Sequence, residues 1–434
     1  MSLRIAPLLL LAVFPGMLRA QAPEPTRLTL EQVVAAAMER NPELAMAQQR
    51  LAIGAGQLLA ARGAFSTRLS TAVTQTRANE RSMGTDGVLS TQPTVLNGSY
   101  QVGLARQFRS GVLVQPTVTM ARTDVAADGA LTANRGSVGM QVMIPLWKDR
   151  GGAVQRMPER AAAQEHEAAR LSLGHTASAV VQEGASAYWG LVAARQRAEV
   201  FRGSEQRAQR MADETRVLVA AGERPAADLN QLLANVASKR IARIAAEQGV
   251  REAQRRLGLV LGMEPARVWS LAPAAADFPA ATAVAPDSAL LPRLVALAVE
   301  RRPDLAAARG GERAAETLMR AARADLKPRL DLAVSLGYDG LEMGSGMGDR
   351  MATLYRNLLG LNSSVQLQYQ LPVRNSEAQG RVMQRAAVLQ QQRIQEHDLV
   401  RQIATGVAVA LEALQGSAES AAQAEAAVGM YRAA

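Results

Sequence analysis

The sequence predicts an internally duplicated α+β membrane protein that combines very long helices with amphipathic β-strands. Three observations predict this fold class. A phrase near Glu39 recurs near Glu300, several segments alternate apolar and polar residues over roughly ten positions, and roughly 60 residues after Arg150 contain few helix breakers. Together they indicate two tandem units, each made of short helices, strands and a long helix.

The N-terminus has the layout of a secretory signal peptide. Arg4 precedes an apolar run from Ile5 to Phe14, and the small residue Ala20 follows. We predict a signal peptide over 1–20, removed before Gln21. The apolar run is too short to span a membrane, and no later segment has about 18 consecutive apolar residues. If the mature chain lies in a membrane, it must therefore do so as a closed β-barrel.

A repeat at a spacing of 261 residues defines the two units. The matched pairs include Glu39 with Glu300, Arg40 with Arg301, Pro42 with Pro303, Leu44 with Leu305, Arg68 with Arg329 and Val73 with Val334. The first unit covers 21–267, an Ala/Pro-rich linker covers 268–288, and the second unit covers 289–434. Each unit opens with a helix, which Thr29 caps in the first unit. Pro42 and Pro303 then begin longer helices that end near Gly63 and Asp325.

Period-two segments predict strands over about 64–147 in the first unit and about 329–371 in the second. The segments are "FSTRLSTAV", "SYQVGLARQF", "VLVQPTVTM" and "SVGMQVMIPLW", followed by "LDLAVSLGY" and "SVQLQYQL". Each has one apolar face and one face of Gln, Ser, Thr and Gly. Strands of about 9–11 residues, with long connections near 80–97, 123–135 and 340–361 and a tight turn at 109–111, are typical of a transmembrane barrel. The alternative is a soluble sheet over a hydrophobic core.

A helix is predicted over about 153–220, with a turn at 221–228 and a returning helix to about Gly258. About 60 helical residues would be about 90 Å long, too long for a compact domain. Apolar residues recur at steps of three and four with many alanines, which indicates coiled packing. Gly222 is expected to adopt the left-handed conformation, Pro225 to lie in the first turn of the new helix, and Asp228 to favour its N-terminus.

Composition excludes several other functions. The chain has no cysteine, only three histidines, and a net charge of +10 in which Lys and Arg alternate with Asp and Glu along helices. We therefore expect no nucleic-acid binding, no metal, no cofactor and no catalytic site. The glycine-rich "GSGMGD" at 344–349 lacks the Lys-Ser/Thr pair and the helix of a phosphate loop, and we interpret it as a flexible loop.

The order of elements resembles the TolC family of outer-membrane efflux proteins. The likeness rests on the twin openings "LTLEQVVAAAMERNPEL" and "LPRLVALAVERRPDL", and on "VMIPLWKDRGG" and "LQYQLPVRNSEAQGR", where strands enter helices. The hairpin "AAGERPAADLNQL" looks like the family's periplasmic tip, and "LGLVLGMEP" looks like its end-of-repeat phrase.

The resemblance implies a homotrimer in outer-membrane lipid, with a shared β-barrel and a coiled-coil tunnel of helices reaching through the periplasm. It also implies a passive channel for efflux or type I secretion that works with a periplasmic adaptor and an inner-membrane transporter. On this sequence the adaptor-contact tip would be Gly222, Glu223, Arg224, Pro225, Asp228 and Leu229. Asp213 and Glu214 could contribute to an acidic constriction.

The chain departs from the family pattern at three points. Pro225 stands where the family tip usually has Ser or Thr. The first unit has four predicted strands where known members have two, so three copies would supply eighteen strands or, with the extra hairpin outside the barrel, twelve. We also expect the second unit to be C-terminally incomplete, as a natural truncation or a fragment. The alternative function is a secreted periplasmic helical scaffold or adaptor-like protein.

Overall fold

The computed structural model describes residues 27–79, 81–83, 89–91, 94–125, 132–271, 273, 278 and 289–433. The predicted signal peptide and most of the linker at 268–288 lie outside these residues. The chain forms two compact units, one from residues up to Ala45 together with 177–280, the other from 46–176 together with 281–434. We call them the hairpin unit and the sheet unit. The hairpin unit contains residues of the first repeat and of the linker, whereas the sheet unit contains parts of both repeats.

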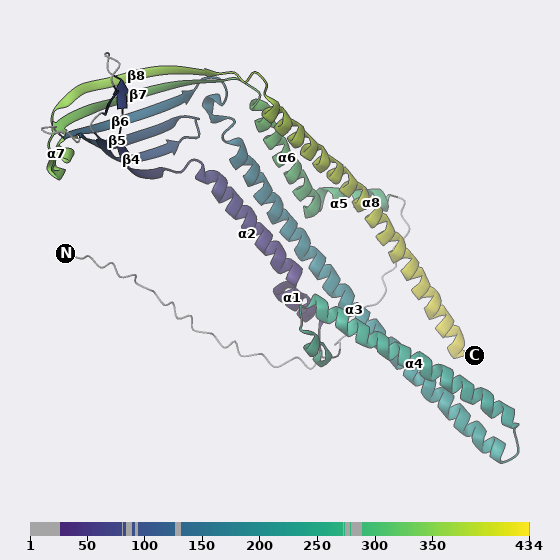
Figure 1. Ribbon diagram of the computed structural model, residues 1–434. Helices are drawn as coiled ribbons and strands as arrows, with labels where there is room; N and C mark the ends of the chain where they lie inside the picture. Colours follow the sequence, from purple (N-terminus) through teal and green to yellow (C-terminus); the bar gives the residue numbers. More distant parts are fainter. Residues whose placement is uncertain are drawn as a thin grey trace, which may run out of the picture. The chain divides into compact units, whose positions relative to one another are not determined.

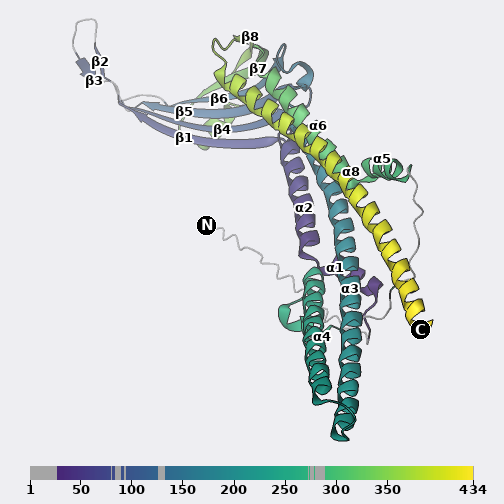
Figure 2. The same cartoon turned by 90° about the vertical axis from the view of Figure 1, so that its right-hand side faces the viewer.

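The sheet unit contains a six-stranded sheet in the order β1-β4-β5-β6-β7-β8, antiparallel throughout (Figures 1 and 2). The strands are β1 (Arg68–Ala78), β4 (Val95–Gln107), β5 (Leu113–Val125), β6 (Ala133–Pro145), β7 (Arg329–Met343) and β8 (Leu358–Gln370). β6 of the first repeat pairs with β7 of the second, with Val142 opposite Val334. The two repeats therefore share one continuous sheet.

The strands and connections differ from the predictions in three ways. β1 has 11 residues, within the predicted length, whereas the other five strands have 13 to 15, because alternation continues at their outer ends. The predicted loop at 80–97 contains a small ribbon of β2 (Arg81–Met83) and β3 (Leu89–Thr91) and the start of β4. The predicted loop at 340–361 contains the short helix α7 (Met347–Ala352), so "GSGMGD" is not simply a loop.

The short helices repeat in the register of the sequence. α2 (Pro42–Gly63) and α6 (Pro303–Ala324) start and end 261 residues apart, and α1 (Leu30–Arg40) and α5 (Leu290–Arg301) end with the same spacing. Thr29 caps α1 as predicted, because its side chain accepts from the Gln32 amide while Gln32 binds back to the Thr29 amide. Each proline begins its helix, as the sequence predicted.

Three long helices complete the fold: α3 (Met157–Ala220), α4 (Ala226–Val260) and α8 (Ser376–Ala433). With 64 residues, α3 is about 96 Å long. It begins at Met157 and not near 153, because the 3-10 turn η1 (Arg150–Gly152) contains two glycines with positive φ. A second 3-10 helix, η2 (Pro265–Ser270), follows α4.

Alanines packed against larger aliphatic side chains form the contacts of the long helices. In the hairpin unit, Ala208 and Ala212 of α3 pack against Val236 and Leu232 of α4. In the sheet unit, Ala315 and Met319 of α6 pack against Leu389 of α8. Such residues allow close approach of the helix backbones, consistent with the coiled packing predicted from the alanine-rich pattern.

Candidate functional surfaces

The sheet has a continuous apolar face that crosses all six strands. One row of paired residues runs Thr71, Val102, Val118, Val138, Tyr338 and Leu361. Neighbouring rows on the same face add Leu69, Val73, Tyr100, Leu104, Met120, Met140, Val142, Val334, Leu336, Val365 and Leu367. Val73, Leu361 and Val365 are 73%, 77% and 73% exposed. An apolar area of this extent is typical of a surface that contacts lipid or another protein.

The opposite face is polar and crowded. Its central row runs Ser70, Gly103, Thr117, Gly139, Gly337 and Asn362, with glutamines and serines in the neighbouring rows. A Cβ added to Gly337 would lie 2.7 Å from the Val138 carbonyl oxygen. Glycine within a strand allows a tight bend or a close approach of backbones. The row of glycines therefore favours a sheet that is concave on its polar face.

The hairpin tip begins with a helix C-cap built on Gly222. Gly222 has φ +78°, as predicted, and its amide donates to the Val219 carbonyl at 3.1 Å. The Glu223 amide donates to the Leu218 carbonyl at 2.9 Å. This pair of hydrogen bonds is a Schellman motif, which satisfies the last carbonyls of α3 and turns the chain sharply.

The other tip residues are arranged around the start of α4. Pro225 is the N-cap, one position before the predicted first turn, and provides no side-chain capping bond. The Asp228 amide donates to the Pro225 carbonyl at 3.2 Å, and the Asp228 carboxylate lies 3.6 Å from the Arg224 guanidinium. Glu223, Arg224 and Pro225 are exposed, while Asp228 and Leu229 are half-buried. The tip therefore presents a compact polar surface at the end of two helices.

Asp213 and Glu214 differ in their surroundings. The Asp213 carboxylate pairs with Arg216 at 2.8 Å and accepts from Gln209 at 3.1 Å, all on α3. Glu214 is exposed and forms no ion pair with any described residue. The negative charge of Asp213 is thus partly compensated within its own helix, and that of Glu214 is not.

Charged side chains also join the two arms of the hairpin. Glu205 of α3 lies 2.9 Å from Arg240 and 2.5 Å from Arg243 of α4. Hydrogen bonds from Arg240 and Arg243 hold the pKa of the Glu205 carboxyl below its ordinary value of 4.5. A carboxyl with a lowered folded-state pKa adds stability above its unfolded pKa, and that stability is lost as pH falls through the folded pKa.

We therefore expect the α3–α4 hairpin to loosen when the pH falls from neutral to below about 4. Amide hydrogen exchange across the hairpin, corrected for intrinsic pH dependence, would measure this. In the Glu205→Gln variant, the hairpin amides should exchange faster at neutral pH than in the original chain, and their exchange rate should change less on acidification. Glu199→Gln is the matched control, since Glu199 pairs only within α3, with Arg202. Equal behaviour of the two variants would contradict the prediction.

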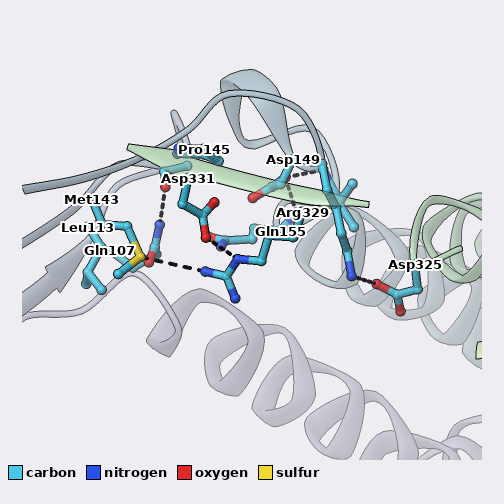
Figure 3. A pocket seen from close by; sticks show the side chains of 12 residues that line it. Gln107, Leu113, Met143, Pro145, Asp149, Gln155, Asp325, Arg329 and Asp331 are labelled. Atoms are coloured by element: carbon cyan, nitrogen blue, oxygen red, sulfur yellow. Dashed lines mark hydrogen bonds and ion pairs between the residues drawn. The ribbon is translucent and has the colours of Figure 1, made fainter. Parts of the chain in front are cut away.

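A cavity of about 250 Å³ lies where the strands continue into helices (Figure 3). Its lining includes Gln107, Lys148, Asp149, Gln155, Arg329 and Asp331. Asp149 has a left-handed backbone with φ +66°, and its Oδ1 accepts from the amides of Val154 and Gln155 at 2.6 and 3.0 Å. Nearby, Lys148 pairs with Asp325 at 2.8 Å. The sequence analysis did not identify this cavity, because its residues come from three separate segments.

Within the described parts of the chain, no group of three or more His, Cys, Asp and Glu residues has the geometry of a metal site. His175 lies 3.7 Å from Asp304. None of the described helices combines the length and apolarity needed to cross a membrane.

Comparison with known proteins finds one family match and several solved structures with the same fold. Residues 294–434 match the outer membrane efflux protein family. No curated protein matches the chain. Solved structures with this fold include the outer membrane protein VceC from Vibrio cholerae, which is 18% identical with a TM-score of 0.64 and an alignment covering 93% of this chain and 83% of that one.

Two further structures agree. The Campylobacter jejuni CmeC outer membrane channel is 14% identical, with a TM-score of 0.59 over 86% of this chain and 68% of that one. The open-state MtrE outer membrane channel of Neisseria gonorrhoeae is 16% identical, with a TM-score of 0.53 over 92% of this chain and 74% of that one. The match over 294–434 and the shared fold support the predicted resemblance to the TolC family and the predicted outer-membrane location, and the matched family is described as one of outer membrane efflux proteins.

Proposed function

We propose that this member of the TolC family of outer-membrane efflux proteins is the passive exit channel of a tripartite efflux or type I secretion assembly. The observation that carries the proposal is the apolar face that crosses all six strands and remains exposed. In water such a face is unfavourable, whereas in a bilayer it matches the acyl chains. The opposite face, with its Gln, Ser, Thr and Gly, suits a wet lumen.

Three copies of the chain would complete the channel. β1 and β8 are the two edges of the sheet, and their outer backbone groups are unpaired within the described chain. Unpaired edges are not tolerated in a bilayer, so neighbouring copies would close the sheet into a barrel. If all six strands take part, a trimer supplies eighteen strands. A secreted helical scaffold, the alternative function, would leave both the edges and the apolar face unexplained.

Conductance of the purified full-length chain in planar bilayers tests the channel directly. We expect discrete current steps that prefer cations, because the paired Asp213 and the unpaired Glu214 would leave a net negative charge near the tunnel entrance. Asp213→Asn combined with Glu214→Gln should reduce the preference for cations, and Glu252→Gln, also on the hairpin, should not. Absence of current steps would refute the channel, whereas unchanged selectivity would refute only the constriction.

The adaptor contact at the tip calls for a cellular test. We expect Arg224→Glu combined with Leu229→Asp to abolish export in cells while leaving bilayer conductance intact, because an adaptor is needed only in the cell. Dye accumulation in a strain without its own copy of the gene measures export. The control, Glu252→Gln, should export normally. Normal export by the tip variant would rule out these residues as the adaptor contact.

A further inference from the structure

The strand–helix cavity contains buried acidic oxygens without partners. Asp331 is 3% exposed, and its Oδ2 accepts from the Arg329 guanidinium while its Oδ1 has no hydrogen-bond partner among the described residues. The Oδ2 atom of Asp149 is also buried without a partner, although its Oδ1 is fully used by two backbone amides. Buried polar atoms are nearly always satisfied, so two such oxygens lining one cavity require an explanation.

One acidic group at the cavity has no ion-pair partner. Lys148 is paired with Asp325, which also lies 3.8 Å from Arg381, and Arg329 is paired with Asp331. Asp149 forms no ion pair with any described residue. Figure 3 shows the Asp149 and Asp331 carboxylates in the same part of the cavity, next to Arg329. A cation bound there would pair with the Asp149 carboxylate and satisfy both free oxygens.

We propose that this cavity binds one divalent metal ion of the hard, oxygen-preferring class, Ca²⁺ better than Mg²⁺. The free oxygens of Asp149 and Asp331 would be the charged ligands. Gln107 donates from its Nε2 to the Gly111 carbonyl at 2.8 Å, which leaves its Oε1 free to act as a neutral ligand. About 250 Å³ leaves room for waters to complete the shell. Ca²⁺ accepts such irregular, partly hydrated sites more readily than Mg²⁺ does.

The ion would fix the strand–helix junction. Asp149 lies between β6 and α3, and Asp331 lies near the start of β7, so one ion would tie the two repeats together at the end of the sheet. This inference does not depend on the channel function. A chain that conducts without binding Ca²⁺ and a chain that binds Ca²⁺ without conducting are distinguishable outcomes.

The test uses the full chain purified in detergent and stripped of metal with a chelator. Isothermal titration with CaCl₂ should show one site per chain, and CaCl₂ should raise the thermal unfolding temperature in a chelator-reversible way. With only two carboxylates, we expect weak binding, in the range of about 10⁻⁴ to 10⁻³ M. Titration with MgCl₂ should show weaker binding.

Asp149→Asn is the informative variant. Asparagine tolerates the left-handed backbone and its Oδ1 can still accept both amide hydrogen bonds, so only the charge is removed. We expect Ca²⁺ affinity to fall about tenfold or more, because ligand charge sets affinity at such sites. Asp339→Asn is the matched control, since its carboxylate is already bound by Arg135 and Asn362.

Three results would overturn the proposal. One is the absence of stoichiometric Ca²⁺ binding, which would mean that the cavity holds only water. Another is unchanged affinity in Asp149→Asn. A third is an equal loss of Ca²⁺ affinity in Asp149→Asn and Asp339→Asn, which would indicate that Ca²⁺ is attracted to the overall negative charge of the sheet and not to this cavity. Asp331→Asn serves as a second variant. Because Asp331 also pairs with Arg329, the unfolding temperature of this variant without metal shows how much stability is lost with that pair alone.

Discussion

Met140→Arg should prevent the chain from assembling stably in the outer membrane. Met140 lies on the apolar face of β6, a central strand, opposite Leu336 of β7, and is 43% exposed. An arginine facing lipid near the bilayer midplane costs about 2–4 kcal/mol per chain, and the cost recurs in every copy of an oligomer. The measurement is the fraction of protein recovered as a folded, heat-modifiable form from outer membranes.

Gln141→Arg is the matched control for this variant. Gln141 is the next residue of β6, on the polar face, opposite Ser335. Arginine there would lie in water, so we expect near-normal assembly. If both variants assembled equally well, the apolar face would not contact lipid. If both failed, the effect would come from β6 itself and not from its faces.

Gly152→Ala should be the most destabilising of the single glycine substitutions at the strand–helix junction. Gly152 has φ +70°, and a Cβ there would lie 2.0 Å from the Arg109 carbonyl oxygen, a backbone atom that cannot rotate away. The left-handed backbone costs alanine about 1–2 kcal/mol. Overpacking adds about 1–3 kcal/mol. Thermal or urea unfolding in detergent measures the sum.

Gly151→Ala separates the two costs. Gly151 has φ +69°, but no atom lies within 4 Å of an added Cβ. We expect Gly151→Ala to lower the free energy of unfolding only by the backbone cost of about 1–2 kcal/mol. Equal losses of stability in the two variants would mean that the Arg109 backbone moves away from the added Cβ at no cost in free energy. The junction would then be less rigid than its geometry indicates.

Much of the fold was predictable because its patterns are local. Side chains of a strand alternate between faces, so "SVQLQYQL" predicted which side of β8 is apolar. The Pro42 and Pro303 helix starts and the Gly222 cap depend on neighbouring backbone geometry, and the structure has all three. The Pro225 position differed by one residue, because proline fixes only its own φ and fits either the N-cap or the first turn.

Three features of the structure were not predicted from the sequence patterns. α7 follows a Gly-rich stretch that favours a loop, yet Asp349 accepts from the Gly346 amide at 3.0 Å and so stabilises the start of the helix. The strand–helix cavity joins residues near Gln107, Asp149 and Asp331, which only the pairing of β4, β5, β6 and β7 brings together. The positive φ of Asp149 was not predictable either, since a non-glycine residue seldom adopts it.

The most direct test of the central claim, that the sheet separates lipid from a watery channel, is thiol accessibility along β8. The chain has no cysteine, so each introduced thiol is the only one. We predict that in isolated outer membranes a hydrophilic maleimide labels Gln366→Cys and Gln368→Cys but not Val365→Cys or Leu367→Cys. Uniform labelling along the strand, or recovery of the protein in the soluble periplasmic fraction, would contradict the account.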